Sequence, residues 1–369
     1  MKKPTAPGSK DQSKTTASST LKEAFKDDFY IGASLSVDQI SGKEPDAMAA
    51  VAKHFNSITP ENILKWEEVH PKPGQYNFEP ADRYVAFGEK HNMHIIGHTL
   101  VWFHQTPAWV FEDDSGKPLG REALLDRMKE HIFTVVGRYK GRIHGWDVVN
   151  EAIIRDGPWR KSKWYEIIGE DYVAKAFEYA RQADPKAELY YNEYDFELRP
   201  KREGIIGLLK GLRAKGVQVD GLGIQGHWFL EQPRLEEIEE QFQAVADLAP
   251  KLMITELDLG VLPVCRFDVK ITDISSYDAA TQKAINPYTG GLPASAEQAQ
   301  AKRCAELFSF FHKWRKKLSR VTFWGVHDAQ SWRNYWPITG RTEYPLLFDR
   351  RCQPKAAVEA IIKVGQGKG

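Results

Sequence analysis

The sequence has little of what marks a metal-cluster protein, a membrane protein or a nucleic-acid-binding protein. Its 369 residues include only 3 cysteines, too few and too far apart for a metal cluster, so we expect no metal site. No run approaches the roughly 20 apolar residues of a membrane span, so we expect no membrane contact. Lysine and arginine total 51 against 50 acidic residues, a balance that gives no long-range field favouring nucleic acid. A neutral partner fits this composition best.

The cysteines and the first residues of the chain leave some questions open. An odd cysteine count leaves at least one thiol unpaired, and a bridge between Cys265 and Cys304 remains an option because connectivity cannot be read from sequence. The stretch MKKPTAPGSKDQSKTTASST lacks the apolar core of a signal peptide. It is rich in Ser, Thr and Pro, so residues 1–21 are predicted to be a disordered leader or linker and residues 22–369 one folded domain.

From about residue 22 onward, short β-like runs alternate with longer amphipathic segments. Between residues 201 and 216, for example, Ile205, Leu208, Leu209 and Leu212 have helical spacing, and Gly216 suits the position just past a helix end. Eight strands with helical connections predict a single-domain α/β fold, the (β/α)8 or TIM barrel. A doubly wound sheet is the alternative, but no glycine-rich phosphate loop follows any strand. The predicted strands are 29–36, 55–61, 94–102, 143–151, 188–196, 221–228, 251–259 and 321–328.

One predicted connection is unusually long. Residues 260–293, after the seventh strand, show no strong periodicity. Loops of this length are usually functional or disordered. On a barrel this loop would lie on the face that carries the active site, where it would extend or obstruct a cleft.

The predicted strands end in polar side chains, and the ends of barrel strands are where catalytic groups project. Strict alternation on the seventh strand would place Leu252, Ile254, Glu256 and Asp258 on one face and the residues between them against helices. Glu256 would then face the barrel mouth. The polar and aromatic residues at these ends are Glu61, Asn62, Lys65, His98, Trp102, Asn150, Glu151, Gln225, His227, Glu256, Asp258, Trp324 and Trp332.

Two glutamates on different strands, Glu151 and Glu256, suggest glycoside hydrolysis by a carboxyl pair. One carboxyl protonates the leaving oxygen while the other attacks the anomeric carbon or activates water, so their environments must separate their pKa values. We expect Asn150 to hold the sugar 2-hydroxyl. His227 is expected to keep Glu256 ionised, with Asp258 as the partner of the imidazole.

Six motifs resemble those of the endo-β-1,4-xylanases of glycoside hydrolase family 10. In chain order they are TPENILKWE, GHTLVW, WDVVNEA, GIQGHW, ITELD and FWGVHDAQSW, and the resemblance extends over about residues 25–365. It implies that Glu151 is the general acid/base, that Glu256 is the nucleophile and that anomeric configuration is retained. It also implies a sugar-binding set and, bordering the leaving-group side, Asn192 and Tyr194. That binding set is Glu61, Asn62, Lys65, His98, Trp102, Gln105, Asn150, Gln225, His227, Trp324 and Trp332.

The resemblance further implies xylan and xylo-oligosaccharides as substrates, no cofactor, a monomer, and a secreted or periplasmic location, although this chain contains no signal peptide. The chain departs from the family pattern after Trp102. The family usually continues with His-Ser-Gln, whereas this sequence has Phe103, His104 and Gln105. One contact near the cleavage site is therefore lost unless His104 replaces it from the next position.

Two other functions remain as alternatives. A β-1,4-glucanase, or an enzyme of mixed specificity, differs in accepting the C5 hydroxymethyl group of glucose. The resemblance implies that Gln105 and Trp332 crowd that group and so favour xylose. A carbohydrate-binding barrel without catalysis is the third possibility, but such a protein need not keep both Glu151 and Glu256.

Overall fold

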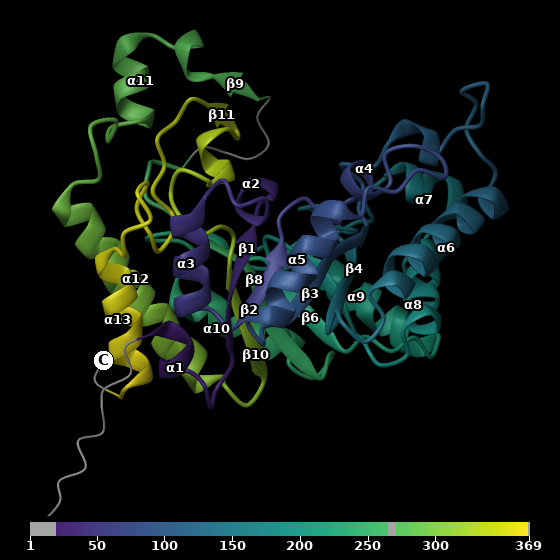
Figure 1. Ribbon diagram of the computed structural model, residues 1–369, viewed down its shortest axis with the longest axis horizontal. Helices are drawn as coiled ribbons and strands as arrows, with labels where there is room; N and C mark the ends of the chain where they lie inside the picture. Colours follow the sequence, from purple (N-terminus) through teal and green to yellow (C-terminus); the bar gives the residue numbers. More distant parts are fainter. Residues whose placement is uncertain (1–19, 265–270, 368–369) are drawn as a thin grey trace, which may run out of the picture.

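The computed structural model describes residues 20–264 and 271–367, and eight parallel strands in this part of the chain close into a barrel (Figure 1). In chain order they are β1 (Tyr30–Leu35), β2 (Ser57–Pro60), β3 (His94–Val101), β4 (Gly145–Asn150), β5 (Glu188–Glu193), β6 (Gly221–Ile224), β8 (Lys251–Gly260) and β10 (Leu318–Phe323). Each pairs with its neighbours in the chain, and β10 pairs with both β8 and β1, which closes the ring. The predicted (β/α)8 barrel is confirmed.

The strand predictions are right in number, but their bounds differ from the observed ones at most ends. The fifth strand ends at Glu193 and the eighth at Phe323, before their predicted ends at residues 196 and 328. The sixth predicted strand is divided into β6 and a short β7 (His227–Phe229), because Gly226 turns the chain with a φ of +81°. β7 pairs with β8 beyond the barrel proper. The eighth strand begins at Leu318, three residues before the predicted start.

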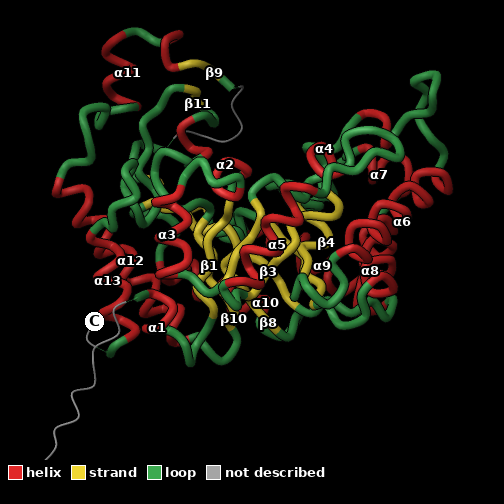
Figure 2. The backbone as a smooth tube through the Cα atoms, in the orientation of Figure 1, coloured by secondary structure: helices red, strands yellow, loops and turns green. Residues whose placement is uncertain are grey.

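Helices surround the strands, as Figure 2 shows in red around yellow. In α9 the predicted apolar positions Ile205, Leu208, Leu209 and Leu212 are all buried, and Gly216 follows the helix end with a φ of +74°. No helix among the described residues is long and apolar enough to cross a bilayer. The larger helices are α3 (Pro45–His54), α5 (Glu79–Lys90), α6 (Arg121–Arg138), α8 (Asp171–Ala183), α9 (Arg199–Ala214), α10 (Leu235–Val245), α12 (Ala294–Lys313) and α13 (Ala356–Gly365).

Short helices complete the fold, and one of them corrects a predicted boundary. The predicted leader, residues 1–21, lies outside the described residues as far as residue 19, but Leu21 begins α1 and is buried. Leu21 therefore belongs to the folded part and not to a leader, because Leu21 and Phe25 are in the core and Phe25 packs against Phe29. The short helices are α1 (Leu21–Ala24), α2 (Val37–Ile40), α4 (Trp66–Val69), α7 (Lys163–Ile168) and α11 (Ala279–Ile285), with 3₁₀ turns at Ala108–Val110, Ile274–Ser276 and Trp332–Asn334.

The interior of the barrel holds a small cluster separate from the main core. Ile96, Tyr190 and Met253 pack together there, and the Arg320 guanidinium lies 5.9 Å from the Tyr190 ring centre. Arg320 donates hydrogen bonds to Thr59 Oγ1 at 3.3 Å and to Thr322 Oγ1 at 3.0 Å. A charged side chain is tolerated inside because it is paired with polar groups and a ring face.

The predicted alternation on the seventh strand is wrong, although Glu256 does face the barrel mouth as expected. Met253 faces the barrel interior, whereas Leu252 and Ile254 belong to the main core shared with the helices. Val321 of β10 pairs with Ile254, but Phe323 pairs with Leu257, so β8 carries one extra residue there. Such a bulge interrupts alternation and re-aims the side chain next to it. Glu256 reaches the mouth because of the bulge.

The long segment after β8 is folded where it is described. It contains β9 (Thr272–Asp273) and α11, and β9 pairs in parallel with β11 (Ile338–Thr339) from the loop after β10. Arg341 donates to the carbonyl oxygens of Ile285 and Pro263, at 3.1 and 2.9 Å. Figure 1 shows this part standing above one side of the barrel end.

The cysteine predictions are tested in part. Cys304 is buried on α12 as a small core residue. Cys304 and Cys352 are free thiols. Cys265, and with it the suggested bridge to Cys304, lies outside the described residues.

Gly97 on β3 offers a test of how tightly the strands are packed. A Cβ at this position would overlap the indole of Trp146, which is buried on β4. We expect Gly97→Ala to lower the free energy of unfolding by about 1–3 kcal/mol, the usual cost of overpacking a filled core. Gly137→Ala is the control, because nothing lies within 4 Å of its Cβ position on α6. Urea denaturation should show a loss for the first variant and none for the second. Equal stability of the two would contradict the packing argument.

Candidate active site

Glu151 lies directly after β4, in a conformation that its neighbours hold. Its φ is +60°, in the left-handed region that non-glycine residues rarely adopt. The Glu151 carboxylate accepts hydrogen bonds from Gln225 Nε2 at 2.9 Å, Trp102 Nε1 at 3.1 Å and Asn150 Nδ2 at 3.2 Å. Three donors from three different strand ends therefore aim this carboxyl group into the barrel mouth.

Glu256 lies on β8, and the residue is 5% exposed. Its Oε1 accepts a hydrogen bond from Asn192 Nδ2 at 2.7 Å, and its Oε2 lies 3.1 Å from His227 Nε2. Asn192 Nδ2 also donates to Asn150 Oδ1 at 2.9 Å, and Asn150 in turn donates to Glu151. The two glutamates thus belong to one hydrogen-bonded network.

Asp258 connects the nucleophile candidate to charges that the sequence did not reveal. Its Oδ2 lies 3.0 Å from His227 Nδ1 and accepts from Trp332 Nε1 at 2.7 Å, while Oδ1 accepts from Arg333 Nε at 2.8 Å. Burial opposes the charge of Asp258, but Arg333 and His227 outweigh it and lower the pKa of Asp258 to about 2. The predicted contact between Asp258 and the imidazole is present.

His227 bridges the two carboxylates. Burial alone would lower the pKa of His227, but the charge and hydrogen bond of Asp258, with those of Glu256, raise it to about 9. At neutral pH the imidazolium therefore donates to both carboxylates, and a protonated neighbour favours the ionised form of Glu256. This charge stabilises the folded state fully below pH 6.5, the ordinary pKa of histidine, and the contribution is lost as the pH rises through about 9.

Asp258→Asn is expected to lower the titration midpoint of His227 by about 1–3 pKa units, because the largest opposing charge is removed while burial remains. The loss of stability that the wild type shows between pH 6.5 and about 9 should then move to lower pH. Ring nitrogen chemical shifts of His227 measure the midpoint. Trp332→Phe is the matched control, since it removes a hydrogen bond to Asp258 without removing the charge. An unchanged midpoint in Asp258→Asn would refute the assignment.

Lys65 lies on the other side of the mouth, 6% exposed. Its Nζ donates to Asn62 Oδ1 and Gln105 Oε1, both at 2.9 Å, and lies 4.6 Å from the Trp102 ring centre. Burial lowers the pKa of Lys65, and the charges of Glu256, Glu61 and Glu151 oppose that shift. Asn62, Lys65, Trp102 and Gln105 are therefore brought together, as predicted.

Glu61, His98 and Trp324 lie near this group. Glu61 Oε2 accepts from Gln330 Nε2 at 3.2 Å, and burial raises the pKa of Glu61. His98 Nδ1 lies 2.9 Å from Asp147 Oδ2, and its ring meets Trp324 edge-on with centroids 5.2 Å apart. His98 is 1% exposed, so it supports neighbouring site residues and is almost inaccessible from the site.

Phe103 and His104, where the sequence departs from the family pattern, have defined contacts in the structure. Phe103 is 39% exposed, and the Arg160 guanidinium lies 3.9 Å from its ring centre. Arg160 also donates from Nε to the Glu151 carbonyl oxygen and from Nη2 to the Tyr194 hydroxyl, each at 2.8 Å. His104 packs edge-on against the Trp102 ring, with centroids 5.2 Å apart. Arg160 therefore contacts the backbone of Glu151 on this side.

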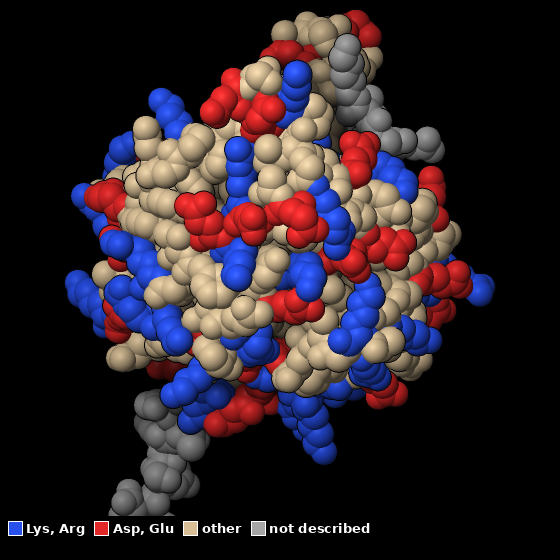
Figure 3. Space-filling model, turned by 90° about the vertical axis from the view of Figure 1, so that its right-hand side faces the viewer, with Lys and Arg blue, Asp and Glu red and all other residues tan. Residues whose placement is uncertain are grey.

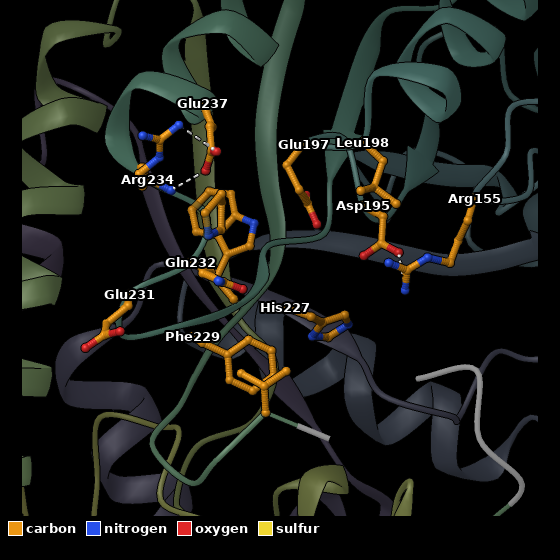
Figure 4. A pocket seen from close by; sticks show the side chains of 13 residues that line it. Arg155, Asp195, Glu197, Leu198, His227, Phe229, Glu231, Gln232, Arg234 and Glu237 are labelled. Atoms are coloured by element: carbon orange, nitrogen blue, oxygen red, sulfur yellow. Dashed lines mark hydrogen bonds and ion pairs between the residues drawn. The ribbon is translucent and has the colours of Figure 1, made fainter. Parts of the chain in front are cut away.

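A cavity of about 700 Å³ adjoins the site at His227 (Figure 4). An ion pair between Arg155 and Asp195 lies on one side of it, and the pair of Arg234 and Glu237 lies on another. Burial and the charge of Asp195 raise the pKa of Glu197, in the cavity wall, to about 7. Of the site residues predicted from the sequence, only His227 lines this cavity. Its wall comes from the loops after β4 and β5, from β7 and the loop that follows it, from Glu237 on α10 and from Val264 after β8. The wall consists of Arg155, Asp195, Glu197, Leu198, His227, Trp228, Phe229, Glu231, Gln232, Pro233, Arg234, Glu237 and Val264.

The remaining functional contacts come from residues that the sequence did not single out. Asp147, Arg160, Gln330 and Arg333 each bond a predicted site residue. Asp147 lies inside the WDVVNEA motif, two residues before Val149 and on a barrel strand, so its position on an inward face was the available signal. Arg333 directly follows Trp332, and no sequence pattern indicates that it reaches Asp258.

Comparison with known proteins is consistent with this geometry. Residues 20–364 match the profile of glycosyl hydrolase family 10. The chain is 41% identical over 347 residues to a protein named endo-1,4-beta-xylanase A from Xylanibacter ruminicola, covering 94% of this chain and 93% of that one. It is 40% identical over 357 residues to a beta-1,4-xylanase from Dictyoglomus thermophilum, covering 96% and 93%.

Solved structures agree in fold. A family 10 endoxylanase from a sugarcane soil metagenome superimposes with a TM-score of 0.89 at 44% identity, covering 94% of this chain and all of the other. The xylanase XynB of Paenibacillus barcinonensis, solved with a conduramine derivative, gives 0.83 at 40% identity, covering 94% and 99%. With the matching profile, the matching fold and the carboxylate pair at the barrel mouth, the chain belongs to glycosyl hydrolase family 10.

Proposed function

We propose that the protein is a retaining endo-β-1,4-xylanase, which hydrolyses internal β-1,4-xylosidic bonds of xylan and xylo-oligosaccharides. The observation that carries the proposal is the pair Glu151 and Glu256, which project from two strands into one mouth and share a network through Asn150 and Asn192. Relatives named endo-1,4-beta-xylanase support the choice of substrate. No cofactor is needed, because both steps are proton and glycosyl transfers between side chains, sugar and water.

In the first step, the Glu151 carboxylic acid gives its proton to the glycosidic oxygen while the Glu256 carboxylate attacks the anomeric carbon. The bond from that carbon to the oxygen breaks, and a covalent glycosyl-enzyme forms. The His227 imidazolium and Asn192 hold Glu256 in its attacking position. In the second step Glu151 takes a proton from water, the water oxygen attacks the same carbon, and Glu256 is released. Two inversions give net retention.

The substrate chain is proposed to run across the mouth. The retained sugar would lie against Asn62, Lys65 and Gln105, which converge beside the Trp102 ring. The leaving part would extend past Tyr194 and into the cavity beside His227. A neutral polymer also suits a surface on which both signs of charge are interspersed, as one face in Figure 3 shows.

A β-1,4-glucanase is the second candidate, because xylan and cellulose differ chiefly in the C5 hydroxymethyl group. Measuring kcat/KM on xylan and on carboxymethyl cellulose separates the two. We expect xylan to be preferred by at least about 10-fold, since rejecting one extra group in a filled pocket is worth roughly 1–3 kcal/mol. Equal values would favour the mixed enzyme, and no release of reducing sugar from either polymer would favour a non-catalytic barrel.

A cellular location and an assembly state complete the proposal. Xylan is a polymer too large to enter a cell, so we propose that the enzyme acts outside the cytoplasm, as a secreted or periplasmic protein. We also propose a monomer, because the site is built from one chain. Light scattering after size-exclusion chromatography measures the mass directly and would reveal a dimer.

A further inference from the structure

A fully buried ion pair lies behind Glu151. Lys201 Nζ, in the first turn of α9, is 2.8 Å from Glu193 Oε1 at the end of β5, and both side chains are 0% exposed. Removing two charges from water is costly, and a buried pair is weak evidence for stability by itself. The pair is explained if it has a role that two apolar side chains could not perform.

Glu193 holds the two backbone amides that follow Glu151. Its Oε2 accepts from the amide of Ile153 at 3.1 Å and from the Tyr191 hydroxyl at 2.8 Å. That hydroxyl accepts in turn from the amide of Ala152 at 3.2 Å. A carboxylate can accept several hydrogen bonds at once, and a methylene group can accept none.

Glu151 needs such support because of its backbone. A non-glycine residue in the left-handed region is strained and persists only where the surroundings determine it. The Glu151 amide donates to the Asn192 carbonyl oxygen at 3.0 Å, so β5 fixes the chain on both sides of the carboxyl group. The direction in which Glu151 points therefore depends on β5 and on what keeps Glu193 ionised.

Lys201 supports the same backbone by a second route. Its Nζ lies 2.9 Å from the centre of the Tyr194 ring, and the Tyr194 hydroxyl accepts from Arg160, which also bonds the Glu151 carbonyl oxygen. Burial raises the pKa of Glu193, and the Lys201 charge opposes that shift. Lys201 thus opposes protonation of the Glu193 carboxylate and contacts the ring that completes the support.

We propose that Glu193 and Lys201 are positioning residues for the acid/base Glu151, fixing the backbone conformation that aims its carboxyl group at the leaving oxygen. This inference rests on the proposed function. It assigns a role to a pair that does not touch the substrate and that acts through Glu151 alone, so the nucleophile Glu256 is not affected.

The test uses leaving groups of different quality. A poor leaving group, such as a xylose unit of xylotetraose, needs its oxygen protonated, whereas 2,4-dinitrophenolate leaves without acid assistance. For Lys201→Met we expect kcat/KM on xylotetraose to fall about 10- to 100-fold, part of the 10²- to 10⁴-fold that acid catalysis contributes. On 2,4-dinitrophenyl β-xylobioside we expect a change of less than about 3-fold, since Glu256 is intact.

Two further variants keep the test decisive. Lys201→Met leaves a carboxylate buried and unpaired, so the double variant Glu193→Gln/Lys201→Met, which removes both charges, is measured as well, because it should fold even where the single variant does not. Lys355→Met is the matched control, since Lys355 forms another buried pair, with Asp328 at 3.1 Å. It should lower stability but change both substrates by the same factor.

A loss of equal size on both substrates in the Lys201 variants, or no loss on xylotetraose, overturns the inference. A leaving-group dependence in Lys355→Met equal to that of the Lys201 variants also overturns the inference. If the wild-type enzyme cleaves neither substrate, the proposed function has failed instead, and the two failures are therefore distinguishable.

Discussion

Glu256→Gly is expected to lower kcat/KM on xylan by roughly 10⁵-fold or more, the scale of losing a covalent nucleophile. The carboxylate that attacks the anomeric carbon is gone, and neither Asn192 nor His227 can replace it. The fold should remain, because Asn192 keeps its hydrogen bond to Asn150 and His227 keeps Asp258. Reducing-sugar release measures the loss, and the thermal unfolding midpoint checks the fold.

Azide should restore part of the activity of Glu256→Gly on 2,4-dinitrophenyl β-xylobioside. The anion enters the space left by the side chain and attacks the anomeric carbon once, so the product is the α-glycosyl azide. Glu256→Gln is the matched control, since its amide fills the same space and leaves no room for azide. A β-glycosyl azide, or substantial xylanase activity in Glu256→Gly, would show that Glu256 is not the nucleophile.

Glu151→Ala should lower kcat/KM on xylan by about 10²- to 10⁴-fold, the usual contribution of general acid and base catalysis. The effect is expected to depend on the substrate. With 2,4-dinitrophenyl β-xylobioside the first step needs no proton, so the glycosyl-enzyme should accumulate and a burst of dinitrophenolate should appear. Stopped-flow absorbance measures the burst.

Azide distinguishes the two glutamates. In Glu151→Ala it attacks the glycosyl-enzyme, so two inversions occur and the product is the β-glycosyl azide. Glu112→Ala, a change of a glutamate outside the barrel mouth that pairs with Lys163, serves as the control and should behave as wild type. An equal loss on xylan and on the activated substrate, with no burst, would contradict the acid/base role of Glu151.

The barrel could be predicted because its signals are local. Runs of four to ten residues with β-forming side chains alternate with segments of helical spacing, and this pattern alone predicts eight strands and a closed parallel fold. The errors lie at the edges of elements. Composition places Thr20 and Leu21 in the leader, because it carries no information about which residues reach the core. In the structure Leu21 packs in the core.

The sequence predicts which residues form the site but not which hydrogen bonds connect them. Glu151, Glu256, His227 and Asp258 stand in recognisable motifs, and their contacts agree with expectation. Arg160 was missed although it bonds the Glu151 carbonyl oxygen, because only the folded loop brings it there. The cavity beside His227 was missed for the same reason, since residues from separate parts of the chain, between Arg155 and Val264, form its wall.

The sequence by itself determined the (β/α)8 barrel, the two glutamates and the family, since each depends on patterns within short stretches of chain. The tertiary structure alone decided how Glu256 comes to face the mouth, through a bulge in β8 that alternation did not foresee. It also decided that a buried Lys201–Glu193 pair lies behind Glu151. The physical reason is that hydrogen bonds and ion pairs form between atoms a few ångströms apart, and sequence distance does not encode that proximity.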